Sequence, residues 1–600
     1  MKRLVLLSQP LFGFLGMKLL KHIIFPLVFI VFSVCVIYGS LGQSFLQETA
    51  DYTPFFFDSV FAKEMFGRVG GFLFYLSSFL QACFCYPWLG ALLFIAVLVA
   101  LAYTIRWVFR VSEELFSVCW LPSLLLLLNY SQVGYLLYLL KTPAIAFTLP
   151  VGVLLAVLLV GCWKRLSHVV WKCLMVVLIP TLGYWGLGVY AEWAAILIVL
   201  FELIEGKKWR FAFAISLLIL VLAVPQVLYG MGYIINLRSS LYTQGLPDYR
   251  WSSEFYYFMP CILTFVVVLI LALFRPRRVQ DKRFYLSCIL FVNGGVYVWL
   301  GTMRDANFRA IVAMKQAIER QDYQHVLDIA SEGKETPTRL QVMFTRLALL
   351  KTGHLADAAF YYPDGSTSYQ APRDEQYLQL IGSRALYYHF GIPNGAYRWG
   401  MEGIVEYGMR PEYLRYMYQS AVVNDEKPLV EKYAALLSRT FYQPQPLSKE
   451  EIDEVKQFMS HPNRLDYDQG VVEGAILNTY SPIVEGEKPV LELSLICNMI
   501  RKDRDAFWEH FAKWWESLGV EAQAAELPTH LQEAVLLFSQ MYQVDITGLP
   551  VSDVTKQRYN DFFGQVRQNA DDNYSRTALK PQFGQTYWYY FFYVDDIITY

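Results

Sequence analysis

The feature that most constrains this chain is a series of nine apolar runs within its first half. Eight of the runs are 17 to 21 residues long and the run near 190–204 has 15, about the length at which an α-helix crosses a hydrocarbon core of ~30 Å. Helices of this kind satisfy all their backbone hydrogen bonds internally, as a bilayer requires. We therefore predict an all-α, polytopic membrane helix bundle. The nine predicted spans lie near 23–41, 88–105, 115–131, 143–163, 169–189, 190–204, 211–229, 256–274 and 284–301.

Charge divides the chain into two different regions. Up to Thr302 there are 22 Lys and Arg against 12 Asp and Glu, whereas the remainder carries 29 against 40. Hydrophobic residues make up 55% of the whole and charged residues only 17%, which is unlike an ordinary soluble enzyme. We predict a transmembrane domain over residues 23–303 and an extracytoplasmic domain over residues 304–600. Residues 1–22 are predicted to form a cytoplasmic amphipathic lead.

The distribution of Lys and Arg between the short connections predicts the orientation. With the amino terminus in the cytoplasm, 17 cations face the cytoplasm and five face the other side. Nine crossings then put the tail outside, which in a bacterium means an inner-membrane protein with a periplasmic domain. The apolar stretch Gly70–Tyr86 is predicted to lie in the interface, because a tenth crossing would largely invert the charge bias. The first outer loop then covers residues 42–87.

From Asp305 onward the pattern is that of amphipathic helices separated by polar turns. The turns of "LLKTGHLADAAF", "YHFGIPNGAYRW", "AVVNDEKPLVEKY" and "MIRKDRDAFWEHF" align at Gly353, Gly391, Asp425 and Asp503. Periods near 34 to 40 residues are typical of stacked helix pairs of the TPR kind. We therefore predict a TPR-like α-solenoid. The aromatic stretch Tyr587–Tyr593 is predicted to dock on the preceding helices.

Motifs for several kinds of chemistry are missing from the sequence. It contains no GxxxxGK[ST] phosphate loop, no HExxH and no GxSxG. The eight histidines are scattered without metal-ligand spacing, and eight of the nine cysteines lie in the apolar half. The predicted spans are nearly free of charge, which disfavours an ion-coupled pump. We expect neither a nucleic-acid partner nor an obligatory cofactor.

Candidate catalytic residues gather on the predicted outer surface. The stretch "QETADYTPFFFDSVFAKE" provides Glu48, Asp51 and Asp58, and Asp58 is also a natural N-cap for a helix. Glu192 lies in a short outer turn. Carboxylates at a membrane surface can deprotonate an acceptor or hold a divalent metal. Their alternative interpretation is an ordinary polar loop.

Two cations and three aromatic side chains complete this predicted surface. Arg238 and Arg250 stand in an outer loop, where guanidinium groups can bind a lipid-linked phosphate or act as interfacial anchors. Phe55, Phe56 and Phe57 are interpreted as a wedge that seats the first loop among the lipid headgroups.

The order of these segments resembles the plan of the GT-C membrane glycosyltransferases. A first span is followed by a long outer loop that opens with acids and continues as interfacial helices, and then by paired spans and an outer tail. In that superfamily an acidic residue early in the first loop is catalytic and the donor is a polyprenyl-phosphate sugar. The resemblance, which concerns topology over about the first 300 residues, implies such a role for Glu48, Asp51 or Asp58. The loop carries neither Asp-Asp nor Asp-x-Asp.

A second resemblance covers the whole chain. The stretches "LALLKTGHL", "YYHFGIPNGAYRWGMEGI", "KYAALLSRTFY" and "FGQTYWYYFFY" are similar to signature stretches of a bacterial integral-membrane family of unknown function with TPR-like tails. It implies a fold and a location, but no activity. Two hypotheses of function therefore stand side by side. One is a transferase that uses a lipid-linked sugar at the outer leaflet, and the other is a non-enzymatic envelope scaffold that recruits periplasmic proteins through its tail.

Overall fold

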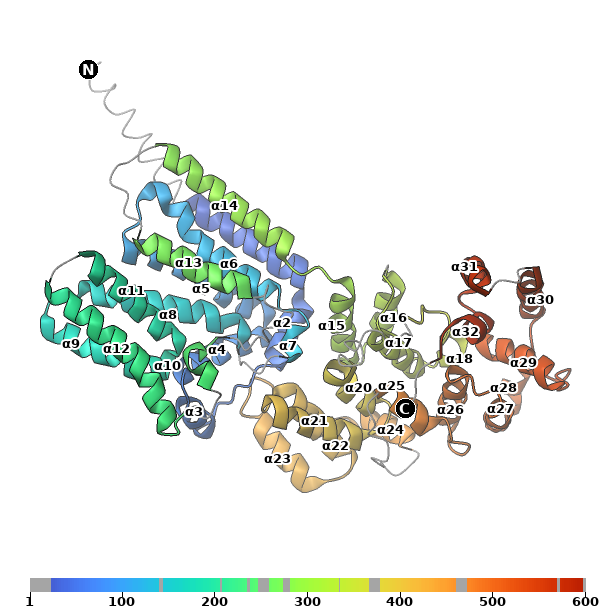
Figure 1. The fold of residues 1–600 in the computed structure, drawn as a ribbon. Helices are drawn as coiled ribbons and strands as arrows, with labels where there is room; N and C mark the ends of the chain where they lie inside the picture. The colour runs from blue at the N-terminus through green and yellow to red at the C-terminus, as the bar shows by residue number, and fades with distance from the viewer. Residues whose placement is uncertain are drawn as a thin grey trace, which may run out of the picture. The chain divides into compact units, whose positions relative to one another are not determined.

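The structure is a computed structural model that describes residues 23–139, 144–205, 208–234, 238–246, 258–273, 281–333, 335–365, 378–459, 472–568 and 572–596. Within these ranges every regular element is a helix (Figure 1). The prediction of an all-α protein is thereby confirmed for the described part of the chain. Two compact units are present, Met1–Arg304 together with Arg439–Tyr442, and Asp305–Ser438 together with Gln443–Tyr600.

Seven helices in the described part of the first unit are long and apolar enough to cross a membrane. Each coincides with one of the nine predicted spans. The third comprises η3 (Glu113–Trp120) and α6 (Leu121–Ser131), and the fifth comprises α9 (Val169–Leu178), η4 (Ile179–Gly183) and α10 (Tyr184–Leu187). The seven are Ile23–Leu41, Pro87–Phe109 (α5), Glu113–Ser131, Ile145–Arg165 (α8), Val169–Leu187, Phe211–Gly230 in α12 (Lys208–Gly230), and Phe284–Gly301 in α14 (Asp281–Gly301).

The other two predicted spans correspond to shorter helices. The helix α11 (Val189–Glu205) has 17 residues and α13 (Met259–Leu273) has 15. At 1.5 Å per residue they are shorter than the seven, although both are strongly apolar. The number of crossings therefore stays a prediction for these two.

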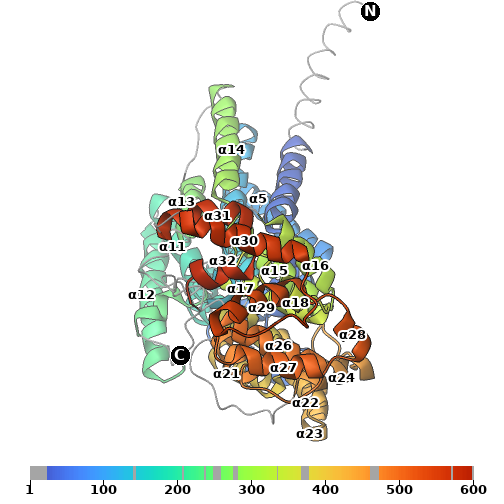
Figure 2. The ribbon, with the colours of Figure 1, turned by 90° about the vertical axis from the view of Figure 1, so that its right-hand side faces the viewer.

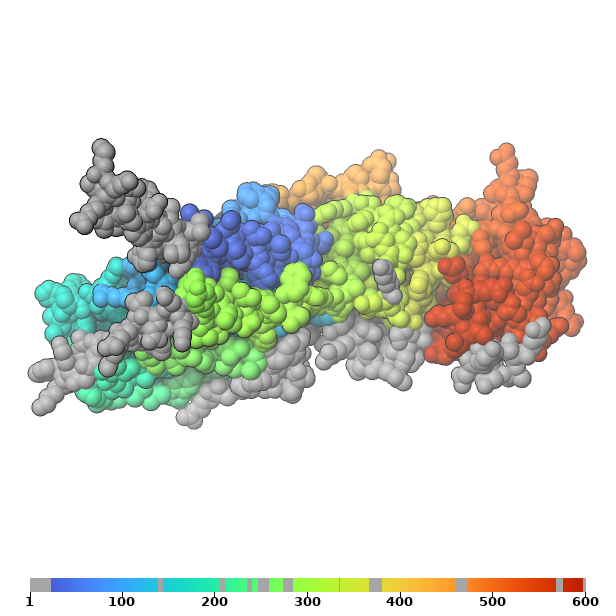
Figure 3. Space-filling model, turned by 90° about the horizontal axis from the view of Figure 1, so that it is seen from above, coloured from blue at the N-terminus to red at the C-terminus, as the bar shows by residue number. Residues whose placement is uncertain are grey.

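Close helix packing in the first unit depends on small residues. A Cβ atom on Gly152 of α8 would lie 2.6 Å from the ring of Tyr190 in α11, and one on Gly161 would lie 2.7 Å from Val108 in α5. Small residues of this kind let helix backbones approach one another. On another face, the helix Ile23–Leu41 and α14 lie side by side (Figures 1 and 3), with the rings of Phe25 and Phe291 5.5 Å apart in an edge-to-face arrangement.

The predicted outer loop folds into short helices. Gly42, with φ of 84°, ends the first long helix and allows the chain to turn into α2 (Gln43–Asp51). Asp58 then caps α3 (Ser59–Phe66) by accepting a hydrogen bond from the backbone N–H of Val60, so its prediction as an N-cap is confirmed. The stretch predicted as an interfacial helix forms α4 (Gly71–Ala82) and η2 (Cys83–Cys85).

The interpretation of Phe55–Phe57 as a headgroup wedge is wrong for two of the three residues. Phe55 and Phe56 are buried inside the first unit, and only Phe57 is exposed. The ring of Phe55 packs against Phe61 at 5.7 Å and against Phe79 at 5.4 Å. Edge-to-face ring pairs of this kind add to the free energy gained by burying the rings. The loop is therefore held together by its own aromatic side chains.

The second unit consists of short helices that pack in sequence. The helices α26 and α27 lie side by side, and α30 to α32 close the carboxyl end (Figure 2). Their bounds are α15 Ala306–Glu319, α16 Tyr323–Glu332, α17 Arg339–Lys351, α18 Leu355–Ala358, η7 Leu378–Gly382, α20 Ser383–His389, α21 Pro393–Tyr407, α22 Pro411–Val423, α23 Lys427–Leu437, α24 Lys449–Phe458, α25 Val472–Tyr480, α26 Lys488–Ile500, α27 Phe507–Glu516, α28 Val520–Ala524, α29 Thr529–Tyr542, α30 Asp553–Gln568, α31 Asp572–Phe583 and α32 Tyr587–Tyr593.

Six helices of this unit end in the same turn. In each case one residue has a left-handed backbone, and the next residue donates its N–H to the carbonyl five residues earlier at 2.7 to 3.1 Å. This is the Schellman arrangement, which satisfies carbonyls left over at the end of a helix. Three of the four turn positions aligned in the sequence hold this place, and the fourth lies one residue earlier than predicted. The left-handed residues are Gln321, Gly353, Gly391, Asp425, Lys502 and Gln543.

The predicted docking of the carboxyl-terminal aromatic stretch is confirmed. The backbone N–H of Tyr587 donates to a carboxylate oxygen of Glu533 at 2.7 Å, and the indole N–H of Trp588 donates to the Glu533 carbonyl at 2.8 Å. Tyr587, Trp588 and Tyr590 are all buried. The helix α32 therefore forms part of the core of the second unit.

Candidate functional site

Two of the predicted catalytic carboxylates are buried together on α2. Glu48 has no exposed surface and Asp51 is 2% exposed. Residues three apart in a helix share a face, so both carboxylates lie on the same side of α2. They directly follow the first membrane-length helix, in a unit whose other helices are mainly apolar. Ionisable groups in such surroundings are costly to keep and usually functional.

Glu48 is positioned by a tyrosine from a distant segment. The hydroxyl of Tyr138, in the short helix α7 (Leu136–Leu139), donates a hydrogen bond to Oε1 of Glu48 at 2.9 Å. The ring of Tyr138 is buried and stands edge-on to Tyr52, with 4.8 Å between the ring centroids. The carboxylate is thus held between α2 and α7 by a buried hydroxyl donor.

A chain of hydroxyl and amide groups continues from the same helix. The hydroxyl of Thr53 donates to the carbonyl of Thr49 at 2.6 Å and accepts from the amide of Gln81 at 2.7 Å. The side-chain oxygen of Gln81 then accepts the backbone N–H of Ala146 at 2.7 Å. Because Ala146 lies in the first turn of α8, this bond satisfies an N–H that has no partner within its own helix. Buried polar side chains therefore connect α2, α4 and α8.

Asp51 lies near Cys85 of η2. Burial, followed by the neighbouring Cys83 and the charge of Asp51, raises the pKa of the Cys85 thiol to about 11. The thiol therefore stays protonated at neutral pH, as a neutral neighbour of a buried carboxylate. Within the described ranges, no group of three or more His, Cys, Asp and Glu residues is arranged to hold a metal ion.

Asp58 occupies a different environment from Glu48 and Asp51. One carboxylate oxygen caps α3, and the other lies 2.5 Å from the guanidinium of Arg439, which belongs to the same unit. The backbone N–H of Val60, followed by the charge of Arg439, holds the Asp58 pKa below its usual range. Asp58 therefore has a structural role, as the cap of α3 and the partner of Arg439.

Glu192 is also buried, but on a separate helix. It is 4% exposed in the first turn of α11, and its Oε1 has no hydrogen-bond partner among the described residues. Of the two predicted phosphate ligands, Arg238 begins η5 (Arg238–Thr243), where only its backbone is described. Arg250 lies outside the described residues.

Sequence reasoning missed Tyr138, the partner of Glu48, and the hydrogen bonds of Thr53 and Gln81. Tyr138 and Gln81 each come from a stretch whose neighbours are mostly apolar. A single polar side chain among apolar ones is a signal for burial in a membrane domain, because such groups need partners there. The stretch Gly70–Tyr86 carried that signal at Gln81.

These features define the class of protein: it is an all-α protein with membrane-length apolar helices and two buried carboxylates on one helix. Residues 18–594 match the model of the Family of unknown function (DUF6057), and the chain belongs to this family. This confirms the predicted membership of an uncharacterised family. Searches of curated proteins and of solved structures give no match.

Proposed function

We propose that this protein is a membrane-embedded transferase that uses a lipid-linked, polyprenyl-phosphate sugar. One observation carries the proposal, namely that Glu48 and Asp51 are buried on the same face of α2 directly after the first membrane-length helix. Carboxylates are rarely retained in apolar surroundings unless they take part in proton or ion chemistry. The topological resemblance to GT-C enzymes adds the class of donor.

The proposed chemistry is an ordinary glycosyl transfer. One carboxylate accepts the proton of the acceptor hydroxyl while that oxygen forms a bond to the anomeric carbon. The bond from this carbon to the phosphate oxygen breaks, and the phosphate leaves with the lipid. Asp51 is the proposed base, and Glu48, oriented by Tyr138, positions the acceptor or a divalent metal. Arg238 and Arg250 remain the proposed phosphate ligands on the grounds of sequence alone.

The proposed setting is the bacterial inner membrane. In this scheme residues 1–22 are cytoplasmic, residues 23–303 form nine spans, and residues 304–600 form a TPR-like periplasmic domain. The bias of 17 cations against five supports the orientation. The carboxylates of the first loop, residues 42–87, then lie toward the outer leaflet, where lipid-linked sugars present their headgroups.

The test is mass spectrometry of envelope glycans and lipid-linked sugars from a deletion strain that expresses single variants. We expect that Asp51→Asn and Glu48→Gln fail to restore a glycan that the wild type restores. The matched control is Asp58→Asn, which changes a carboxylate of the same loop that is partly exposed and paired with Arg439. Protein levels are compared by immunoblot. If Asp51→Asn restores the glycan, or if deletion changes no glycan, the transferase proposal is wrong.

A second candidate function is a non-enzymatic scaffold that recruits periplasmic proteins. It is favoured by the six equivalent helix turns of the second unit, because stacks of helix pairs commonly present an open binding face. A photo-reactive residue in place of Val405, which is 84% exposed, tests this in the full-length protein. The matched control carries the photo-reactive residue in place of Val520. Partners that cross-link to the Val405 variant and not to the Val520 variant would support the scaffold, and a Val405 variant that cross-links to no specific partner would contradict it.

A further inference from the structure

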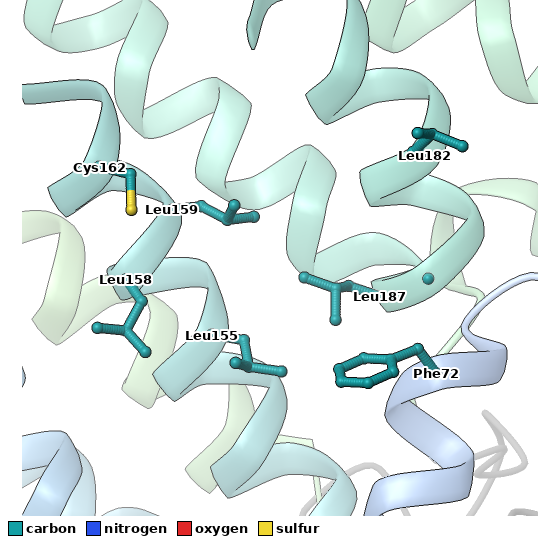
Figure 4. A pocket seen from close by; sticks show the side chains of 8 residues that line it. Phe72, Leu155, Leu158, Leu159, Cys162, Leu182 and Leu187 are labelled. Atoms are coloured by element: carbon teal, nitrogen blue, oxygen red, sulfur yellow. The ribbon is translucent and has the colours of Figure 1, made fainter. Parts of the chain in front are cut away.

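An apolar groove opens on the surface of the first unit. It lies between α8 and the helix Val169–Leu187, with the beginning of α4 at one end (Figure 4). Its volume is about 370 Å³, within the range of pockets that bind small ligands. The groove is lined by Phe72, Leu155, Leu158, Leu159, Cys162, Leu182, Gly186 and Leu187.

The shape of the groove follows from its two walls. On α8, Leu155, Leu158, Leu159 and Cys162 repeat at helical spacing and form one continuous apolar stripe. The opposite wall contains Gly186, where the absence of a side chain leaves space. A Cβ atom there would meet only Phe72, at 3.7 Å. Both walls belong to membrane-length helices, so we expect the groove to face hydrocarbon when these helices span a bilayer.

One end of the groove carries groups suited to a lipid headgroup. Arg68 is exposed and lies in the turn before α4, four residues before Phe72. Its guanidinium donates to the Sδ of Met65 and lies over the ring of Phe74, 6.0 Å from the ring centroid. The backbone N–H of Gly70 donates to the carbonyl of Trp185 at 2.7 Å, and the indole N–H of Trp185 donates to the Phe66 carbonyl at 2.8 Å. These bonds keep the turn before α4 beside the wall that contains Gly186. Tryptophan and arginine together are typical of the headgroup level of a membrane.

We propose that this groove binds one acyl chain of an anionic phospholipid, with the phosphate at Arg68. An arginine provides a forked set of donors that matches a phosphate, so it selects an anionic headgroup over a zwitterionic one. The wholly apolar walls offer no polar partner to a sugar or a peptide. The inference is independent of the proposed transferase activity, because it concerns neither Glu48 nor Asp51.

The experiment uses the full-length protein in nanodiscs that contain equal amounts of phosphatidylglycerol and phosphatidylcholine. Native mass spectrometry then reports which lipid stays bound. We expect the wild type to retain one phosphatidylglycerol. Arg68→Gln should lower the ratio of retained phosphatidylglycerol to phosphatidylcholine about fivefold, as expected for the loss of one charge-assisted contact. The control is Arg110→Gln at the carboxyl end of α5, which should leave this ratio unchanged.

A second variant, compared with its own control, fills the groove instead of changing the charge at its end. Gly186→Leu should lower total lipid retention about tenfold, which corresponds to the loss of about two buried methylene groups. The control is Gly295→Leu in α14, where a Cβ atom would meet nothing within 4 Å. Elution volume and unfolding temperature show whether each variant is folded.

Three results would overturn the proposal. The first is a wild-type protein that retains no lipid, and the second is a lipid ratio that Arg68→Gln does not change. The third is a wild-type dimer that Gly186→Leu converts into a monomer, since a second copy of the chain would then occupy the groove. Equal loss of lipid in Gly186→Leu and Gly295→Leu would also overturn the proposal, because lipid retention would then not depend on the groove.

Discussion

At the scale of single residues, the second unit contains a histidine whose ionisation opposes folding. His389 is buried, and its Nδ1 lies 3.3 Å from the hydroxyl of Tyr323. Burial, followed by the positive charge of Lys351, lowers the His389 pKa to about 3. The unfolded chain binds a proton at this side chain near its ordinary pKa of about 6.5, whereas the folded chain does not.

This difference predicts a stability that falls with acidification. The folded state is favoured fully above about pH 6.5, and its advantage is lost as the pH falls from there toward about 3. We expect His389→Gln to reduce the drop in unfolding temperature between about pH 7.5 and about pH 5.5. The control His354→Gln, at an exposed histidine, should keep the wild-type drop. An unchanged drop in His389→Gln would contradict the assignment.

The residue scale is also where prediction from sequence succeeded least. The acids Glu48 and Asp51 were predicted because they open the loop that directly follows the first apolar span, a signal that is local in the chain. Their partner Tyr138 is 90 residues away from Glu48, and no local pattern reveals such a pairing. The assignment of Phe55 and Phe56 to the membrane surface failed for the same reason. Their packing against Phe61 and Phe79 is a tertiary contact that no local pattern reveals.

At the scale of elements, the shared helix turn allows a matched comparison between two glycines. Gly353 and Gly391 both have a left-handed backbone, with φ of 74° and 85°. A Cβ atom on Gly353 would meet nothing within 4 Å, whereas one on Gly391 would lie 2.5 Å from the Cβ of Phe458. The two positions thus share a backbone conformation and differ in the space around it.

Alanine substitution should separate these two contributions. Gly353→Ala should cost about 1–2 kcal/mol of unfolding free energy, the strain of a left-handed alanine. Gly391→Ala should cost about 1–3 kcal/mol more, because the added methyl group also overpacks the contact with Phe458. Denaturant unfolding of the full-length variants measures both values. Equal losses would show that the surroundings of Gly391 relax freely.

Elements were the level at which the sequence was most informative. Apolar length alone identified all seven membrane-length helices of the described part, because it follows directly from the thickness of a bilayer. The turn at Lys502 was placed one residue late, at Asp503, because aspartate is the commoner turn residue. The span predicted over 190–204 is two residues shorter than α11, and the span predicted over 256–274 is four residues longer than α13. Apolar character alone does not mark where a helix ends.

At the scale of the whole molecule, the parity of the crossings matters more than their number. Seven and nine crossings both put the second unit on the side opposite to the amino terminus, whereas eight would put it on the same side. The helices α11 and α13 therefore either both cross or both do not if the charge bias is right. The side of the membrane on which the residues beyond Asp305 lie therefore tests whether α11 and α13 share the same behaviour.

Cysteine labelling in a cysteine-free background measures that side. We expect Val405→Cys, which replaces an exposed residue, to react with a membrane-impermeant maleimide in intact spheroplasts. Arg110→Cys, at the end of α5 predicted to face the cytoplasm, should react only after the membrane is opened. Protection of Val405→Cys until lysis would mean an even number of crossings.

The position of α32 in the sequence has a consequence for biosynthesis. Its residues Tyr587 and Trp588 bind Glu533, and the hydroxyl of Tyr590 donates to the carbonyl of Ile500. These contacts join the interior of the second unit to a segment that the ribosome makes last among the described helices. The unit therefore cannot complete this part of its core while α32 is still inside the exit tunnel, so the contacts of Glu533 and Ile500 with α32 form only after that helix has left the ribosome.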